Sequence, residues 1–131
     1  MERKTLQAYL LGRFPERKDI LLDKIPEEVL SSCREYSKKN KKEECCGIIV
    51  NNNNKLIFKP CNNISNDRKS FFMIDPYEII DNNVEYIFHS HCLAGPRPSS
   101  SDIKSSIELC IPFLIYSVLS DSFYLYDNIG V

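Results

Sequence analysis

The stretch HSHCLAGPRPSSSD, residues 89–102, decides the expected fold and chemistry of this chain. It follows a run of β-forming residues, VEYIF (84–88), and begins with His89 and His91, the two histidines of the protein. Side chains two residues apart on a strand point to the same face, so both rings can approach one metal ion at about 2.0 to 2.1 Å from each nitrogen. Taken alone, an HxH pair is also compatible with two neighbouring histidines that bind nothing.

An acidic residue completes the pattern. Asp102 follows Ser99 by three positions, at the expected start of a helix over SSSDIKSSIELC, residues 99–110. The three protein ligands His89, His91 and Asp102 would leave one position of a zinc ion open to water, which is the mark of a catalytic zinc site. Ser-x-x-Asp is also a capping pair at a helix N-terminus, and the capping role and the metal role are compatible with each other.

The segments around this stretch predict an α/β fold. Residues 25–39, IPEEVLSSCREYSKK, place Pro26 at a first helical position, acidic residues in the first turn and lysines in the last, which is typical of a helix. A second helix is expected near Asp75, with Pro76 in its first turn. Runs of β-forming residues predict strands at 45–50, 55–59, 70–74, 84–88, 113–120 and 122–127. With the asparagines 51–54 as a hairpin turn, this order indicates a single compact mixed β-sheet domain flanked by helices.

Chain length indicates one domain behind a short leader. A chain of 131 residues is the usual size of a single domain and can bury a real core. Residues 1–24 hold charges and scattered apolar positions, broken by Gly12 and Pro15, and we interpret them as an N-terminal leader segment that packs against another surface. Residues 25–131 then form the folded domain.

Composition excludes several classes of protein. The chain is 43% hydrophobic and 27% charged, as in ordinary globular domains rather than disordered chains. Its net charge of −1 provides no field that would attract nucleic acid or anionic lipid. No stretch approaches the roughly 18 apolar residues that cross a bilayer, and the N-terminal apolar run is too short for a signal peptide. We therefore expect a cytoplasmic protein with no nucleic-acid and no membrane partner.

The cysteines are predicted to be free thiols. The chain has six of them, at Cys33, Cys45, Cys46, Cys61, Cys92 and Cys110. In a secreted chain this number would suggest a disulfide framework, whereas a chain without an export signal is expected in a reducing cytoplasm. No CxxC pair is present, so the usual spacing of a structural zinc site is missing.

These residues together resemble the JAMM or MPN+ metalloproteases, whose motif is an upstream Glu followed by His-x-His, seven residues, and Ser-x-x-Asp. The full spacing is matched by His89, His91, Ser99 and Asp102. Upstream, EECCGIIV (43–50) is similar to the family's Glu-x-Cys-Gly before a hydrophobic strand, and its register selects Glu44 rather than Glu43. The resemblance covers roughly residues 25–127 and implies an architecture like that of cytidine deaminases.

The resemblance also implies a mechanism. Zn²⁺ bound by the two histidines and Asp102 would lower the pKa of its water to about 7 and so supply hydroxide at neutral pH. Glu44 would act as the base that takes the proton of this water and returns it to the leaving amine. Ser99 would donate a hydrogen bond to the developing oxyanion. Without the family register, Glu44 would be interpreted as a solvated member of the run KKNKKEE, residues 38–44.

The chain departs from its relatives directly after the second histidine. Many relatives have Pro at this position, whereas this chain has Cys92. A thiolate there would be an alternative metal ligand or an oxidation-sensitive neighbour of the site, and a neutral thiol would be a small substitute for Pro.

The implied function is a zinc-dependent peptidase or isopeptidase. Between Glu44 and His89 the chain lacks the long insertions with which eukaryotic relatives hold ubiquitin, so polyubiquitin specificity is not expected. The short form resembles bacterial and bacteriophage members, and the segments ECCG and IPFLIYS most resemble the phage tail-assembly branch. The resemblance thus implies a protein or peptide substrate, such as a ubiquitin-like protein or a phage tail component, in the host cytoplasm or the virion tail.

A catalytically silent MPN-type structural module in a tail or another protein complex is the alternative function. Inactive relatives commonly lose ligands of the motif, and none is lost here. A zinc deaminase is set aside, because that chemistry needs H-x-E together with P-C-x-x-C.

Overall fold

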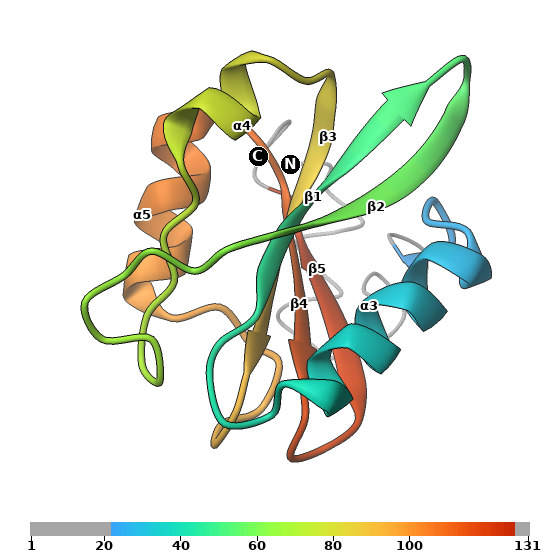
Figure 1. The fold of residues 1–131 in the computed structure, drawn as a ribbon. Coiled ribbons are helices and arrows are strands. Elements are labelled where there is room, and N and C mark those ends of the chain that lie inside the picture. Colours follow the sequence, from blue (N-terminus) through green and yellow to red (C-terminus); the bar gives the residue numbers. More distant parts are fainter. Residues whose placement is uncertain (1–21, 128–131) are drawn as a thin grey trace, which may run out of the picture.

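A five-stranded sheet forms the centre of the protein, with its strands in the order β2-β1-β3-β4-β5. The computed structural model describes residues 22–127, and Figure 1 shows helices on both sides of this sheet. In chain order the elements are α3 (Glu27–Lys39), β1 (Cys46–Asn52), β2 (Lys55–Cys61), α4 (Pro76–Ile80), β3 (Val84–His91), α5 (Ser100–Leu109), β4 (Phe113–Ser117) and β5 (Ser122–Tyr126). The predicted class, a mixed sheet flanked by helices, is confirmed.

The sheet is mixed because one connection crosses over. β1 pairs antiparallel with β2 and β3, and β4 pairs antiparallel with β5. β3 and β4 are parallel, so the chain between them must cross from one end of the sheet to the other, and α5 makes this crossover. The crossover begins at the end of the sheet where β3 finishes. The N-terminus of α5 therefore lies near His91.

Side-chain alternation divides the core between the two faces of the sheet. On β1 and β3, Ile49 and Phe88 face α3, whereas Ile48 and Ile87 face the opposite side. The cluster on the α3 side contains Ile25, Val29, Leu30, Cys33, Ile49, Phe88, Leu114, Tyr116, Phe123 and Leu125. The cluster on the other side contains Cys46, Ile48, Cys61, Ile74, Ile87, Phe113 and Ile115. Both faces are covered, so the inner strands β1, β3 and β4 contain continuous runs of buried residues.

The prediction of a strand at residues 70–74 is wrong. This segment joins no ladder of the sheet, and its backbone groups bond to the neighbouring loop instead. The Ile64 N–H donates to the Met73 carbonyl at 2.9 Å, and the Met73 N–H donates to Oδ1 of Asn63 at 3.1 Å. Of the residues SFFMI, Phe72 and Ile74 pack into the core on the side of the sheet opposite α3, whereas Phe71 and Met73 are exposed.

Two strands also end at other residues than predicted, β3 and β4. β3 does not stop before the histidines but runs on to His91, because His89 pairs with Cys46 on one side and with Ile115 on the other. The run at 113–120 ends as a strand at Ser117, after which the chain turns. Both histidines are therefore fixed by sheet hydrogen bonds.

The predicted hairpin turn is confirmed, but its loop has two residues, Asn53 and Asn54, because β1 continues to Asn52. Asn53 and Asn54 both have positive φ, 53° and 65°. Two-residue hairpin loops prefer this conformation because its twist matches that of the flanking strands, and Asn tolerates it better than most residues.

Residues 1–21 lie outside the described part of the chain, and with them most of the expected leader segment. Leu22 packs against the core cluster on the α3 side. The division into leader and domain stays a prediction. No helix within residues 22–127 has the length and apolarity needed to cross a membrane.

Gly47→Ala is expected to destabilise the fold by about 1–3 kcal/mol. A Cβ at this position would lie 2.6 Å from the Lys59 carbonyl oxygen and 2.6 Å from the Phe58 ring, so the β1–β2 pair would have to shift. Urea unfolding of the native and variant proteins measures the change. Gly95→Ala is the matched control, because nothing lies within 4 Å of a Cβ there. Equal stability of both variants would contradict close packing of β1 on β2.

Candidate metal centre and its cleft

The end of β3 presents two imidazole rings on one face. His89 is fully buried and His91 is 8% exposed. Their ring centroids lie 5.1 Å apart, so the rings converge although their backbones are two residues apart. The same-face arrangement expected from strand geometry is present.

Asp102 bridges both rings from the first turn of α5. Nε2 of His89 lies 3.1 Å from its Oδ1, and Nε2 of His91 lies 3.1 Å from its Oδ2. Asp102 is itself buried, with 6% of its surface exposed. The carboxylate thus offers one oxygen to each ring.

Ser99 fixes where this carboxylate points. The Asp102 N–H donates to Oγ of Ser99 at 3.1 Å, and the Ser99 N–H donates to Oδ2 of Asp102 at 2.9 Å. This reciprocal pair is a capping box at the start of α5. The cap and the contact with the histidines coexist in one side chain, as the sequence allowed.

A backbone carbonyl orients His91. Nδ1 of His91 lies 2.8 Å from the Gly95 oxygen, and a carbonyl can only accept, so Nδ1 carries the proton and donates. Nε2 is then the nitrogen that faces Asp102. Metal-binding histidines are commonly oriented by such a bond from the other ring nitrogen.

Aromatic side chains enclose His89. Its ring stacks on Phe72 at 4.3 Å between centroids and meets the edge of Phe113 at 5.6 Å. Both ring nitrogens are buried without a hydrogen-bond partner within residues 22–127, although Nε2 is close to Asp102. Buried polar atoms without partners are costly and need an explanation, and a cation beside Nε2 supplies one.

Glu44 approaches the same place from the segment before β1. One of its carboxylate oxygens and a nitrogen from each histidine lie within 4.8 Å of one another, a group that could hold a metal ion. Its backbone is fixed on both sides, since the Glu44 N–H donates to the Arg68 carbonyl at 2.7 Å and Nδ2 of Asn63 donates to the Glu44 carbonyl at 2.9 Å. Glu43 points elsewhere and pairs with Arg68 at 3.7 Å.

Ser90, the residue between the histidines, ties Glu44's segment to β3. The Cys45 N–H donates to Oγ of Ser90 at 2.8 Å, and the Ser90 N–H donates to the Cys45 carbonyl at 2.9 Å. Sequence reasoning missed this role of Ser90 and also that of Asn63. No signal in the sequence indicates the role of Ser90, because it stands between two other polar residues of β3.

The two carboxyl groups have opposite environments. Burial raises the pKa of Glu44 to about 8, partly offset by His91. Burial acts on Asp102 as well, but its contacts with both histidines outweigh it and hold the pKa of Asp102 well below its usual value. Burial lowers the pKa of His89, whereas the bonds of His91 to Asp102 and Gly95 outweigh burial and raise the pKa of that ring. One carboxyl is thus held ionised and the other takes up a proton readily, a division typical of acid–base sites.

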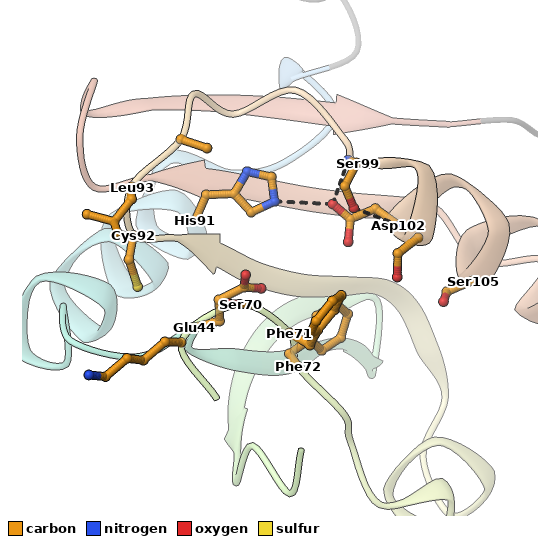
Figure 2. A pocket seen from close by; sticks show the side chains of 13 residues that line it. Glu44, Ser70, Phe71, Phe72, His91, Cys92, Leu93, Ser99, Asp102 and Ser105 are labelled. Atoms are coloured by element: carbon orange, nitrogen blue, oxygen red, sulfur yellow. Dashed lines mark hydrogen bonds and ion pairs between the residues drawn. The ribbon is translucent and has the colours of Figure 1, made fainter. Parts of the chain in front are cut away.

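Glu44, His91 and Asp102 line an open cleft of about 300 Å³, whereas fully buried His89 is not part of its wall. Figure 2 shows the Glu44 carboxylate directed toward His91, with Asp102 and Ser99 beside that ring and Phe71 and Phe72 along the cleft. The cleft is lined by Glu44, Lys69, Ser70, Phe71, Phe72, His91, Cys92, Leu93, Ala94, Ser99, Ser101, Asp102 and Ser105. Apolar walls with a few converging polar groups are the usual form of a small ligand site.

The thiol of Cys92 lines this cleft and is partly exposed. Burial raises its pKa, with further contributions from Glu44 and Glu43. The side chain is therefore a neutral thiol near pH 7, the state in which it substitutes for Pro without adding charge. All six cysteines are free, as predicted.

The donor set fits a small divalent cation. Ligands at about 2.0–2.2 Å from a tetrahedral zinc ion are roughly 3.3 Å from one another, and the two contacts between Nε2 and carboxylate oxygen are each 3.1 Å. Two imidazoles and one carboxylate are ligands that suit zinc, and the cleft leaves access for a further ligand. Nε2 of buried His89 makes no hydrogen bond although Oδ1 of Asp102 lies 3.1 Å away, and this is the structural observation that favours an ion between them.

A mixed sheet that presents two histidines and an acidic side chain beside a cleft is the arrangement of a JAB or MPN domain. A family model described as prokaryotic homologs of the JAB domain matches residues 26–126, and the chain belongs to this family. The resemblance inferred from the motif is confirmed. The JAB domain family includes metal-dependent isopeptidases.

One solved structure supports the fold. The solution structure of a protein from Desulfitobacterium hafniense is 20% identical, with a TM-score of 0.56, and the match covers 79% of this chain and 83% of that one. The solution structure of a protein from Salinibacter ruber is 17% identical, with a TM-score of 0.48, and the match covers 78% of each chain. No curated protein sequence matches the chain.

Proposed function

We propose that this protein is a zinc-dependent peptidase or isopeptidase that hydrolyses an amide bond. The convergence of Glu44, His91 and Asp102 at one cleft, with buried His89 in contact with Asp102 behind them, is the observation that carries the proposal. Membership in the JAB domain family supports it, because hydrolytic members of that family are metal-dependent.

His89, His91 and Asp102 would hold the zinc ion, with Glu44 beside it. Bound zinc lowers the pKa of a water molecule and polarises a carbonyl oxygen. Asp102 is the preferred third ligand because its two oxygens are each 3.1 Å from a histidine Nε2 and its direction is fixed by the cap of α5. The alternative trio, with Glu44 as ligand, would leave Asp102 as the free carboxylate. Asp102 is a poor proton carrier, because its contacts with the histidines hold its pKa well below its usual value.

Glu44 and Ser99 would supply the chemistry of the protein itself. The Glu44 carboxylate takes a proton from the attacking water and gives it to the leaving amine. Oγ of Ser99 accepts the Asp102 N–H, so its own hydrogen stays free to donate to the oxygen on which negative charge develops. Glu44 thus acts on the nitrogen side of the amide by moving protons, and Ser99 acts on its oxygen by stabilising negative charge.

The substrate we propose is a protein or peptide. Phe71, Phe72 and Leu93 give the cleft apolar contacts for an extended chain, and Lys69 adds one positive charge. A ubiquitin-like protein and a phage tail component are the candidate substrates, in the host cytoplasm or the virion tail. The affiliation with phage tail-assembly members stays a prediction from the segments ECCG and IPFLIYS.

Metal content and peptide cleavage test this function. Protein purified without a metal-affinity tag should contain about one zinc per chain by elemental mass spectrometry. Zinc-loaded protein is then incubated with a library of peptides and isopeptide-linked conjugates that includes Gly-Gly junctions. Cleavage that a chelator abolishes and added zinc restores would support the proposal. Folded, zinc-loaded protein that cleaves no member would favour the catalytically silent module.

A further inference from the structure

The loop of residues 62–75, between β2 and α4, forms one wall of the cleft. It contains Phe71 and Phe72 and has no regular secondary structure apart from a turn. It contacts the site at two places, because the Arg68 carbonyl accepts the Glu44 N–H and Phe72 stacks on His89. The shape of this loop therefore affects both a proposed base and a proposed metal ligand.

One side chain holds this loop together. Nδ2 of Asn63 donates to the Glu44 carbonyl and to the Phe71 carbonyl, each at 2.9 Å. Oδ1 of Asn63 accepts from the Ser65 N–H at 3.0 Å and from the Met73 N–H at 3.1 Å. These four bonds use both donors and both acceptor positions of the amide, and they fix which end is nitrogen, because carbonyls only accept and amides only donate.

Three of the four bonds of Asn63 reach Glu44 itself and the two neighbours of Phe72. The carbonyl that Asn63 holds at Glu44 belongs to the residue that carries the carboxylate. The bonds to Phe71 and Met73 fix the residues before and after Phe72, whose ring is 4.3 Å from that of His89. Both positions thus depend on the same amide group.

We propose that Asn63 is a positioning residue that sets Glu44 relative to His89. This inference rests on the proposed hydrolytic function. Asn is required because the position needs two donors and an acceptor on a short side chain: Asp would direct an oxygen at two carbonyl oxygens, and Gln would displace the amide by one carbon. A displacement of about 1 Å in such a site can lower the rate 100-fold.

Asn63→Asp is the principal test, with Asn62→Asp as its matched control on an exposed neighbouring asparagine. We expect kcat on a cleaved library peptide to fall by about 10- to 100-fold with KM within about twofold, because the substrate contacts remain while the base is misplaced. Zinc content should stay near that of the native protein, since no ligand is changed. Asn62→Asp should behave as the native protein. Native kcat in Asn63→Asp would overturn the inference.

Amide hydrogen exchange tests the same inference without a substrate. In zinc-loaded Asn63→Asp the amide of Glu44 should exchange at least about 10-fold faster, while those of Ile48 and Phe88 in the sheet keep their native rates. Unchanged exchange at Glu44 would refute the role of Asn63 even in a protein that cleaves nothing, so this failure is separable from failure of the proposed function. If Asn63→Asp does not fold, Asn63→Ser, which retains one hydroxyl donor, replaces it with the same expected direction.

Discussion

Asp102→Asn is expected to remove zinc from the purified protein while leaving the fold intact. The substitution keeps the shape of the side chain, and its amide oxygen can still accept the Ser99 N–H, so the capped start of α5 should survive. It removes the negative charge that faces both histidines at 3.1 Å. Loss of a charged ligand should weaken zinc binding by at least about 100-fold, more than the loss of an outer hydrogen bond does.

Elemental mass spectrometry and competition with a chromogenic chelator measure this loss. Glu108→Gln is the matched control, because it neutralises an exposed acid on the same helix. It should bind zinc as the native protein does. The contrary result, native zinc affinity in Asp102→Asn together with loss in Glu44→Gln, would assign the third ligand to Glu44 and overturn the proposed division of roles.

The parts of the site that follow local rules were predictable from the sequence. His89 and His91 share a face because strand side chains alternate, and Asp102 lies in the first turn of α5 because Ser99 caps that helix. Each of these statements involves residues close in sequence. The distance between Asp102 and the histidines follows from one crossover, which parallel pairing of β3 and β4 imposes.

The parts that depend on distant contacts were not predictable. The β-forming run at 70–74 has the composition of a strand, and its bonds to Asn63, Ile64 and Asp67 explain why it is a loop. The bond from Cys45 to Ser90 joins residues far apart in the chain, and nothing in the spacing of polar residues indicates it. In each case the local structure depends on hydrogen bonds between distant residues, which local propensity does not indicate.

The position of Glu44 shows how the two kinds of information combine. Its register before Cys46 and Gly47 singles it out in sequence, whereas its burial follows from bonds to Arg68, Asn63 and the segment around Ser90. A glutamate at the end of a charged run would otherwise be solvated, as Glu43 is. Burial without a permanent ion-pair partner gives a carboxyl group suited to exchanging protons.

Glu44→Gln is therefore expected to retain zinc and to lose hydrolysis by about 10²- to 10⁴-fold in kcat, the usual contribution of a general acid–base group. Gln has nearly the shape of Glu, and the backbone bonds that hold this position do not involve the carboxylate, so the fold and the ligands should persist. What is lost is the ability to take a proton from water and return it to the amine. Peptide cleavage and zinc content are measured on the same preparation.

Glu43→Gln is the matched control for this variant. It changes the adjacent acid in the same way, but its side chain is exposed and pairs with Arg68 outside the cleft. Native activity in Glu43→Gln with inactive, zinc-loaded Glu44→Gln would support Glu44 as the base. Full activity in Glu44→Gln would contradict that role, and proton transfer would then have to involve another group of the cleft. Because Asp102→Asn is predicted to fail in binding and Glu44→Gln in turnover, the pair separates ligand from base by two independent measurements.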